Sequence, residues 1–243
     1  MRPEVYREMA AVQQRHWWFA ARRRIIAAVL GKLAVPLDAE ILEIGCGTGG
    51  NLAMLAAFGH LRAMEYDEQA RSVAAALGIC PVSRGGLPES VPFDDATFDL
   101  VCLLDVLEHI EDDCGALARA ARLLKPSGRL LVTVPAYAWL WSAHDEAHHH
   151  RRRYTSGLLG LRARTAGLAV TRLGYFNTLL FPLIAGARIG RKLAGRDEGS
   201  DASLPPSPVN ALLAGVFGLE RHVVRNMLFP FGTSVMAVLS RRP

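Results

Sequence analysis

Residues 43–50 read EIGCGTGG and carry three glycines, Gly45, Gly47 and Gly50, in the spacing G-x-G-x-x-G. A short apolar run precedes them and an apolar helical pattern follows, which predicts a buried strand that turns directly into a helix. Glycine lets the backbone approach a ligand closely, and the first turn of a helix offers free N–H groups. The spacing therefore predicts a loop that holds a nucleotide-like cofactor.

Two carboxylates near this loop bear on which cofactor it holds. Glu65 comes about 20 residues after the first glycine, where an acidic residue binds the ribose hydroxyls of a dinucleotide or of S-adenosylmethionine alike. Glu43 stands at the end of the predicted strand. Its carboxylate suits the ammonium of a methionine moiety and fits poorly beside a pyrophosphate. Glu43 therefore favours S-adenosylmethionine over a nicotinamide dinucleotide.

The polar segment 136–155, AYAWLWSAHDEAHHHRRRYT, is the second candidate for chemistry. It follows a predicted parallel strand, at the sheet edge where ligands of open α/β folds bind. A hydroxyl acceptor needs a general base, and histidine is the usual choice. We predict His144 as this base, with Asp145 or His149 as alternatives; a solvated surface loop would explain the same composition. The histidine and carboxylate spacing matches no metal-binding template, so no metal site is predicted.

Alternating strands and helices must position these residues. Strands are predicted at 39–45, 60–67, 80–85, 98–104 and 129–135, and helices at 4–33, 50–59, 68–78 and 112–128. This alternation is typical of βαβ units, so we predict an α/β fold with a doubly wound, Rossmann-like, mostly parallel sheet.

The second half of the chain follows a different pattern. We predict a loop over 136–155, a helix over 156–167, and two strands, 168–176 and 233–240, that pair as antiparallel strands on the sheet. Residues 177–228 form a helical insertion, interrupted at 197–208 by DEGSDASLPPSP, a composition that predicts a mobile linker.

Length and composition favour a single folded domain over 1–243, with a net charge of +5. We divide it into a helical cap (1–37), a cofactor-binding half (38–136) and an acceptor-side half (137–243). The four cysteines are scattered, which predicts free thiols in a reducing compartment. The sequence shows no secretory signal and no membrane-spanning run, so we expect a cytoplasmic location.

Five motifs together point to a known family. The segments EIGCGTG, EYD, LPESVPFDDATFDLV, DVLEHI and RLLKPSGRLLVTVP occur in this order. In order and spacing they resemble the successive motifs of class I S-adenosylmethionine-dependent methyltransferases. The resemblance covers about residues 38–175 and the last strand, and it implies a Rossmann-like fold, S-adenosylmethionine as cofactor and methyl transfer as the reaction.

The resemblance also implies roles for individual residues. Glu65 would bind the ribose, Tyr66 would pack on the adenine, and the backbone near Gly86 and Leu87 would replace the acidic residue that many relatives place beside the adenine. Asp105 and Val106 would line the methionine and sulfonium end. The cofactor loop itself would consist of Glu43, Gly45, Cys46, Gly47 and Gly49.

The segments outside the core resemble a bacterial subgroup associated with glycan, lipid or natural-product pathways. We therefore expect a small-molecule acceptor, most simply a hydroxyl, with N- or C-methylation, an NAD-dependent oxidoreductase or a non-catalytic module as alternatives. Trp18, Arg152 and Tyr154 are the predicted acceptor contacts. The apolar, basic-ended segment 177–193 suits a membrane surface, burial or a homodimer contact. No nucleic-acid partner is expected, since the basic residues are not interleaved with stacking aromatics.

Overall fold

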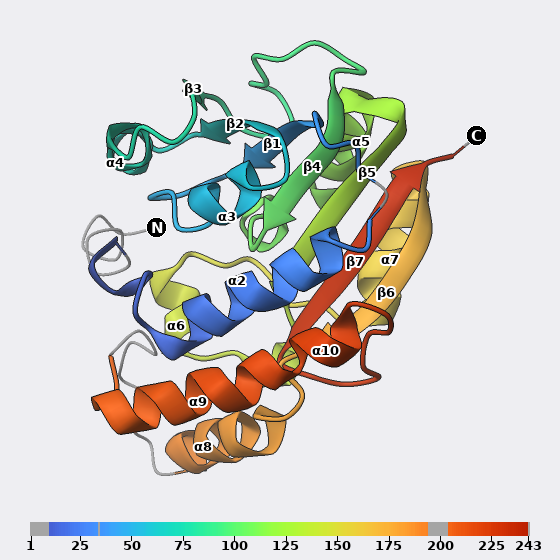
Figure 1. The fold of residues 1–243 in the computed structure, drawn as a ribbon. Coiled ribbons are helices and arrows are strands. Elements are labelled where there is room, and N and C mark those ends of the chain that lie inside the picture. Colours follow the sequence, from blue (N-terminus) through green and yellow to red (C-terminus); the bar gives the residue numbers. More distant parts are fainter. Residues whose placement is uncertain (1–9, 34, 194–203, 243) are drawn as a thin grey trace.

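The computed structural model describes residues 10–33, 35–193 and 204–242. Its centre is a seven-stranded sheet in the order β3-β2-β1-β4-β5-β7-β6 (Figure 1). The strands are β1 (Glu40–Ile44), β2 (His60–Glu65), β3 (Val82–Arg84), β4 (Phe98–Leu104), β5 (Leu124–Pro135), β6 (Leu168–Phe176) and β7 (Ser234–Arg241). The predicted Rossmann-like fold is confirmed.

The antiparallel strands lie where the sequence pattern places them. β1 pairs in parallel with β2 and β4, and β4 pairs in parallel with β5. β7 inserts between β5 and β6 and is antiparallel to both. The chain therefore returns to the sheet only after it has passed through the insertion that follows β6.

Helices cover both faces of the sheet. On one face, α2 (Trp17–Leu30), α3 (Leu52–Ala56) and α4 (Glu68–Ala76) contribute to one apolar core cluster, and α9 (Ser207–Leu219) and α10 (Arg221–Val224) pack on α2. On the other face, α5 (Asp113–Leu123) and α7 (Ser156–Thr165) fill a second cluster. All seven side chains of β4 are buried between these layers, as the apolar run over 100–104 predicts for a central parallel strand.

Several predicted boundaries are wrong. The helix predicted over 112–128 ends at Leu123, and β5 begins at Leu124. Lys125 precedes Pro126, and a residue before proline is disfavoured in the α-region, so the strand starts early. The loop predicted over 136–155 contains the short helix α6 (Ala143–Ala147), because Ser142 and Asp145 form a capping box at its start.

Two further predictions fall partly outside the described residues. The N-terminal helix is described only from residue 10 onward, and α2 begins at Trp17. Of the predicted linker, residues 197–203 lie outside the described part, whereas Ser207 and Pro208 already belong to α9. α8 (Phe181–Leu193) precedes this segment. Within the described ranges, no helix has the length and apolar character needed to cross a membrane.

Turns at the carboxyl edge of the sheet adopt an unusual backbone conformation. Asp105 follows β4 with φ 61°, Tyr137 lies two residues beyond β5 with φ 56°, and Asn177 follows β6 with φ 58°. Positive φ is uncommon for residues other than glycine and is often found at ligand sites. This edge is therefore the place to look for a functional site.

Candidate functional site

A cavity of ≈ 1030 Å³ opens at the carboxyl edge of the sheet. The ends of β1, β2, β4 and β5 reach it through Ile44, Glu65, Leu104 and Pro135, and β7 contributes Ser234 at its start. One end of the cavity is bordered by the glycine loop, and the other by α6, α8 and the histidines that follow α6. We call them the loop end and the histidine end.

The glycine loop has the conformation that its sequence predicts. Gly45 has φ 70°, and a Cβ there would lie 2.7 Å from Cγ2 of Val106, so only glycine fits. Gly47 has φ 55° and lines the cavity, and a Cβ there would meet no atom within 4 Å. Gly49 points away from the cavity: its Cβ would contact Leu77 and Leu52. Gly45, Cys46 and Gly47 line the cavity, whereas Gly49 closes the turn behind it.

Glu65 holds the loop from the end of β2. Its Oε2 accepts a hydrogen bond from the N–H of Gly47 at 2.7 Å, and its Oε1 accepts from the N–H groups of Tyr66 and Asp67 at 2.9 Å. The side chain is 7% exposed and lines the cavity. Glu65 therefore fixes the shape of the loop in addition to its predicted contact with a ribose.

The predicted adenine contacts lie beside Glu65. The ring of Tyr66 is 70% exposed and packs against Gly86, where a Cβ would lie 3.2 Å from the ring. Gly86 exchanges two 2.9 Å hydrogen bonds with Ser90, so its N–H is already donated. Gly86 and Leu87 line the cavity. Because the N–H of Gly86 already binds Ser90, Gly86 can contact an adenine by packing but not by donating this hydrogen bond.

Glu43 lies deeper than expected. It is 1% exposed and is not part of the cavity wall, and its Oε1 accepts a hydrogen bond from Asn51 Nδ2 at 2.8 Å. Its Oε2 has no hydrogen-bond partner among the described residues. Burial raises the pKa of Glu43 to about 7, against the opposing effects of Asn51 and Arg22. Glu43 therefore places a buried acid behind the loop and orients Asn51, which does line the cavity.

An ion pair that the sequence analysis missed ties α2 to the middle of the sheet. Arg22 contacts Asp105 Oδ2 at 2.7 Å and donates to Thr133 Oγ1 at 2.8 Å, and Thr133 donates to Asp105 Oδ1 at 3.1 Å. The guanidinium lies 5.1 Å from the ring centre of Trp18. Trp18, Arg22, Asp105 and Val106 all line the cavity. The spacing of Trp18 and Arg22 by one helical turn was the available signal.

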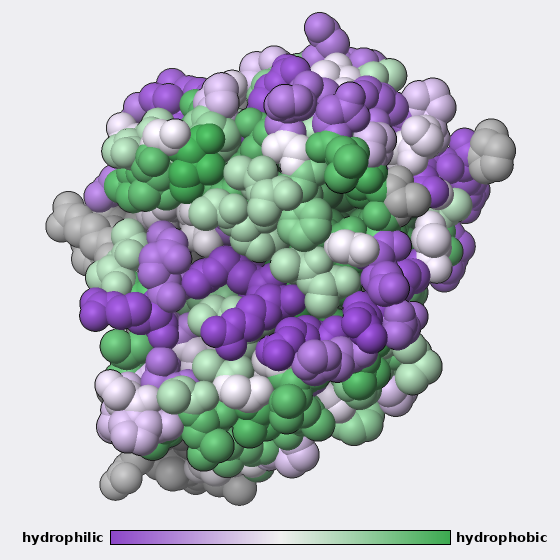
Figure 2. Space-filling model, in the orientation of Figure 1, coloured by the Kyte–Doolittle hydropathy of each residue, from purple (hydrophilic) through white to green (hydrophobic). Residues whose placement is uncertain are grey.

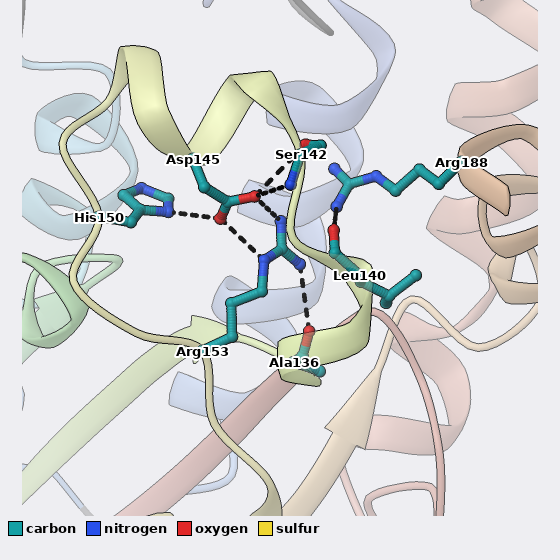
Figure 3. Close-up of polar contacts among 7 residues, drawn as sticks. All are labelled: Ala136, Leu140, Ser142, Asp145, His150, Arg153 and Arg188. Carbon is teal, nitrogen blue, oxygen red and sulfur yellow. Dashed lines mark hydrogen bonds and ion pairs between the residues drawn. The ribbon is translucent and has the colours of Figure 1, made fainter. Parts of the chain in front are cut away.

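A buried charge cluster supports the histidine end (Figure 3). Arg153 makes a bidentate contact with Asp145, with both N–O distances 2.8 Å, and His150 Nδ1 lies 2.8 Å from Asp145 Oδ1. Ser142 donates its N–H to Asp145 Oδ2 at 2.9 Å. Burial would raise the pKa of Asp145, but His150 and Arg153 outweigh it and hold this pKa well below its usual range.

This arrangement corrects the prediction for Asp145. The carboxylate is 0% exposed, it is not part of the cavity wall, and both its oxygens are occupied. Asp145 is thus a structural anion that positions Arg153 and His150 rather than a general base. His149, the other alternative base, is exposed, has φ 55° and also lies outside the cavity wall.

Three histidines within or just after α6 do face the cavity. His144, His148 and His150 line it, with ring centres 4.1 Å apart for His144 and His148 and 5.7 Å apart for His148 and His150. Burial, followed by the nearby His144, lowers the pKa of His148 to about 2. His109 also lines the cavity, and burial followed by His150 lowers its pKa to about 3. His148 and His109 are therefore neutral imidazoles near neutral pH.

Two of the predicted acceptor contacts are misplaced. Tyr154 is 0% exposed, and its hydroxyl donates to Asp113 Oδ2 at 3.1 Å. Arg152 pairs with the same Asp113 at 3.0 Å and donates to the Glu111 carbonyl at 2.8 Å. Neither residue lines the cavity. Both instead attach the segment before α7 to α5, because Asp113 is a buried acid that needs these partners.

Glu108 is the second residue that the sequence analysis missed. It is 0% exposed, lines the cavity, and neither of its carboxylate oxygens has a hydrogen-bond partner in another described residue. Burial, followed by the charge of Asp105, raises its pKa well above the usual value. Its position within DVLEHI, beside an apolar run, gave no indication that the side chain would turn toward the cavity.

Residues 15–173 match the family of the methyltransferase domain. A probable S-adenosylmethionine-dependent methyltransferase of Mycolicibacterium smegmatis is 29% identical over 57% of this chain and 55% of its own length. Cycloartenol-C-24-methyltransferase 1 of Oryza sativa is 30% identical over 50% of this chain and 37% of its own length. The chain thus spans 55% of the length of the first relative and 37% of the length of the second.

Solved structures support the fold. A complex of the Haloferax volcanii Trm112 methyltransferase activator with a candidate methyltransferase superposes with a TM-score of 0.64, at 19% identity and 100% coverage of both chains. A TehB-like SAM-dependent methyltransferase from Corynebacterium glutamicum gives a TM-score of 0.55 at 17% identity, covering 89% of this chain and 87% of the other. At these identities the likeness concerns the architecture alone.

Proposed function

Since the chain belongs to the methyltransferase-domain family and is a class I S-adenosylmethionine-dependent methyltransferase, we propose that it methylates a hydroxyl group of a small-molecule acceptor. The acceptor would be a glycan, a lipid-linked compound or a secondary metabolite. One observation carries the proposal: a single cavity joins the glycine loop to the histidine end, so a methyl donor and a hydroxyl acceptor can share it.

At the loop end, the residues present suit S-adenosylmethionine. The open, left-handed Gly47 leaves room for close approach, Glu65 stands where ribose hydroxyls would lie, and Asn51, oriented by the buried Glu43, lines the cavity beside the loop. We propose that Tyr66 packs on the adenine and that Asp105 and Val106 border the sulfonium end. S-adenosylmethionine supplies a methyl group on a positively charged sulfur, and the protein supplies orientation for an in-line transfer.

At the histidine end, we propose that His144 accepts the proton of the acceptor hydroxyl. His144 lies in the first turn of α6 and lines the cavity. A general base must be within reach of the acceptor in this way. Leu183, Ile184 and Ala187 of α8 line the same end, which suits an acceptor with an apolar part. Arg188 also lines it and would suit an anionic group such as a phosphate.

Carbon is the second candidate acceptor atom. The name of the rice relative assigns methylation to carbon 24 of cycloartenol, and the apolar wall of α8 suits such a substrate too. N-methylation also stays a proposal. The family match argues against the NAD-dependent oxidoreductase, whereas the labelled-methyl assay described below distinguishes an active enzyme from a non-catalytic module.

Peripheral membrane contact through 177–193 and a homodimer also stay proposals. Figure 2 shows apolar side chains gathered over α8 and α9, below a band of hydrophilic residues. Leu183 is 62% and Leu212 65% exposed. An exposed apolar surface of this kind suits either a lipid surface or a second copy of the chain.

Transfer of a labelled methyl group from S-adenosylmethionine to a panel of free glycans, lipid-linked glycans and phenols tests the proposal. We expect label in a lipid-linked or otherwise partly apolar hydroxyl compound. In His144→Ala, turnover should fall about 10²- to 10⁴-fold, the usual contribution of a general base, with unchanged affinity for S-adenosylmethionine. Unchanged turnover would remove His144 as the base, and label only in amines or carbon acids would contradict the hydroxyl acceptor.

A further inference from the structure

Three side chains from two separate stretches of the sequence converge at the histidine end of the cavity. Glu108 and His109 follow β4, and His150 lies 41 residues after His109 along the chain. One potential ligand atom from each lies within 4.8 Å of the others, and all three residues line the cavity. We propose that Glu108, His109 and His150 bind a divalent transition-metal ion such as Zn²⁺, Mn²⁺ or Fe²⁺.

Glu108 supplies the first argument, because its carboxylate is buried and has no hydrogen-bond partner in another described residue. An unpartnered buried carboxylate is costly. The two arginines that face it do not compensate it: Arg22 is paired with Asp105, and Arg153 is paired with Asp145. A cation within the group formed by Glu108 and the two histidines would supply the missing charge.

The orientation of the histidines supplies the second argument. His150 Nδ1 is held by Asp145 Oδ1 at 2.8 Å, which leaves Nε2 for a ligand (Figure 3). The ring of His109 makes a hydrogen bond to the backbone of His149. Metal-binding histidines almost always use their other ring nitrogen in this way, with a carboxylate or a backbone carbonyl as partner. Both histidines therefore have the outer partners expected of metal ligands.

The donor set indicates the class of ion. Two imidazoles and one carboxylate, with further positions open to a cavity, suit first-row divalent metals better than Mg²⁺ or Ca²⁺, which prefer oxygen donors. His148 also lines this wall, with its ring centre 5.7 Å from that of His150. The site differs from a closed structural zinc site because the cavity can supply an exogenous ligand.

A role for the ion rests on the proposed function. An acceptor hydroxyl bound to the ion becomes more acidic, and its proton passes to His144 and then to water. The oxygen then forms a bond to the methyl carbon, and the carbon–sulfur bond breaks with its electron pair going to sulfur. The sulfonium becomes a neutral thioether, so charge and atoms balance without a further reactant.

Metal binding can be tested without the acceptor. The 243-residue chain, stripped with a chelator and carrying no affinity tag, is titrated with Zn²⁺ by calorimetry and with Co²⁺ by absorption spectroscopy. We expect one ion per chain and a Co²⁺ spectrum with nitrogen and oxygen donors. Glu108→Gln should weaken binding more than the roughly 10- to 100-fold that loss of an outer partner costs. His222→Gln, at an exposed histidine far along the chain, is the control and should bind as wild type does.

Glu108→Gln should fold, because no hydrogen bond to another residue is lost. His109→Gln is the second variant and should also lose the ion. Absence of stoichiometric uptake by the wild-type protein, or equal affinity in both variants, would overturn the site. These outcomes are distinct from failure of the proposed function, in which the ion binds normally but no hydroxyl compound receives a methyl group. Loss of S-adenosylmethionine binding in Glu108→Gln would instead assign this residue to the cofactor.

Discussion

The two ends of the cavity are built by different means. The loop end is held mainly through backbone groups: Glu65 accepts hydrogen bonds from three backbone N–H groups, and Gly45 and Gly47 allow the turn. The histidine end is held by side chains: Asp145, Arg153 and His150 form a buried cluster that joins α6 to the following segment. One end depends on local conformation, the other on charges brought together by the fold.

This difference suggests that one end of the cavity can be altered without changing the other. The clearest link between them is Arg22, which ties α2 to Asp105 and Thr133 between the two ends. Contacts within one end should therefore be broken with little effect on the other, since independent sites more than about 7–10 Å apart usually behave additively.

The largest expected effect comes from Asp145→Asn. The substitution leaves Arg153 buried without its anion, and breaking a buried pair in this way costs about 3–5 kcal/mol. The free energy of unfolding, measured by denaturant titration, should fall by this amount, while affinity for S-adenosylmethionine in the folded protein stays unchanged. Glu146→Gln, at the exposed neighbouring position, is the control. A loss of binding free energy for the cofactor as large as the loss of unfolding free energy would show that the two ends are not separable.

Glu65→Gln should act at the loop end. An amide in place of the carboxylate removes charge-assisted hydrogen bonds, each worth about 1.5–3 kcal/mol, and affinity for S-adenosylmethionine should fall about 10- to 100-fold. Calorimetry measures this change, with Glu68→Gln on the exposed side of α4 as control. The histidine end should keep whatever affinity for Zn²⁺ the wild-type protein shows. Normal affinity for the cofactor would count against a contact between Glu65 and the ribose.

A further expected effect is a pH dependence that belongs to the loop end alone. The pKa of Glu43 is raised to about 7 in the folded protein, so the unfolded chain releases this proton first as pH rises. Glu43 should therefore lower stability between about pH 4.5 and 7, by up to about 1.4 kcal/mol per pH unit, and the effect should level off above that range.

Glu43→Gln isolates this contribution, because the amide does not titrate. The difference in unfolding free energy between variant and wild type should grow from pH 5 to 7 in the absence of ligand. His109 and His148, whose pKa values are lowered, act in the opposite direction at acid pH in both proteins and cancel in the difference. A difference that does not vary with pH would mean that Glu43 is already ionised.

The sequence predicted the loop end better than the histidine end, for a physical reason. Gly45, Gly47 and Glu65 act through strand ends and turns that short motifs encode. Asp145 and Tyr154 were wrongly expected to meet a ligand, because their partners Arg153 and Asp113 belong to contacts that local spacing reveals poorly. Glu108 and Arg22 were missed since their direction depends on how α2 and the turn after β4 pack.

The fold was predicted correctly for the same reason, since local sequence patterns encode its elements. The apolar run of β4 and the alternation of elements determined the sheet, and even the antiparallel pairing of β6 with β7 followed from the pattern at the end of the chain. Helix ends were less predictable: α5 stops before Pro126, and α6 forms from a capping box within a polar segment. In both places a single local interaction outweighs the average composition.

The left-handed turns at Asp105 and Asn177 have a consequence for the evolution of this chain. Both residues line the cavity, and each is held in a conformation that costs about 1–3 kcal/mol when the residue is not glycine. Glycine would relieve this strain but would also remove the two side chains from the ligand's surroundings. Any gain in stability from glycine at either position would therefore come together with the loss of a side chain from the cavity wall.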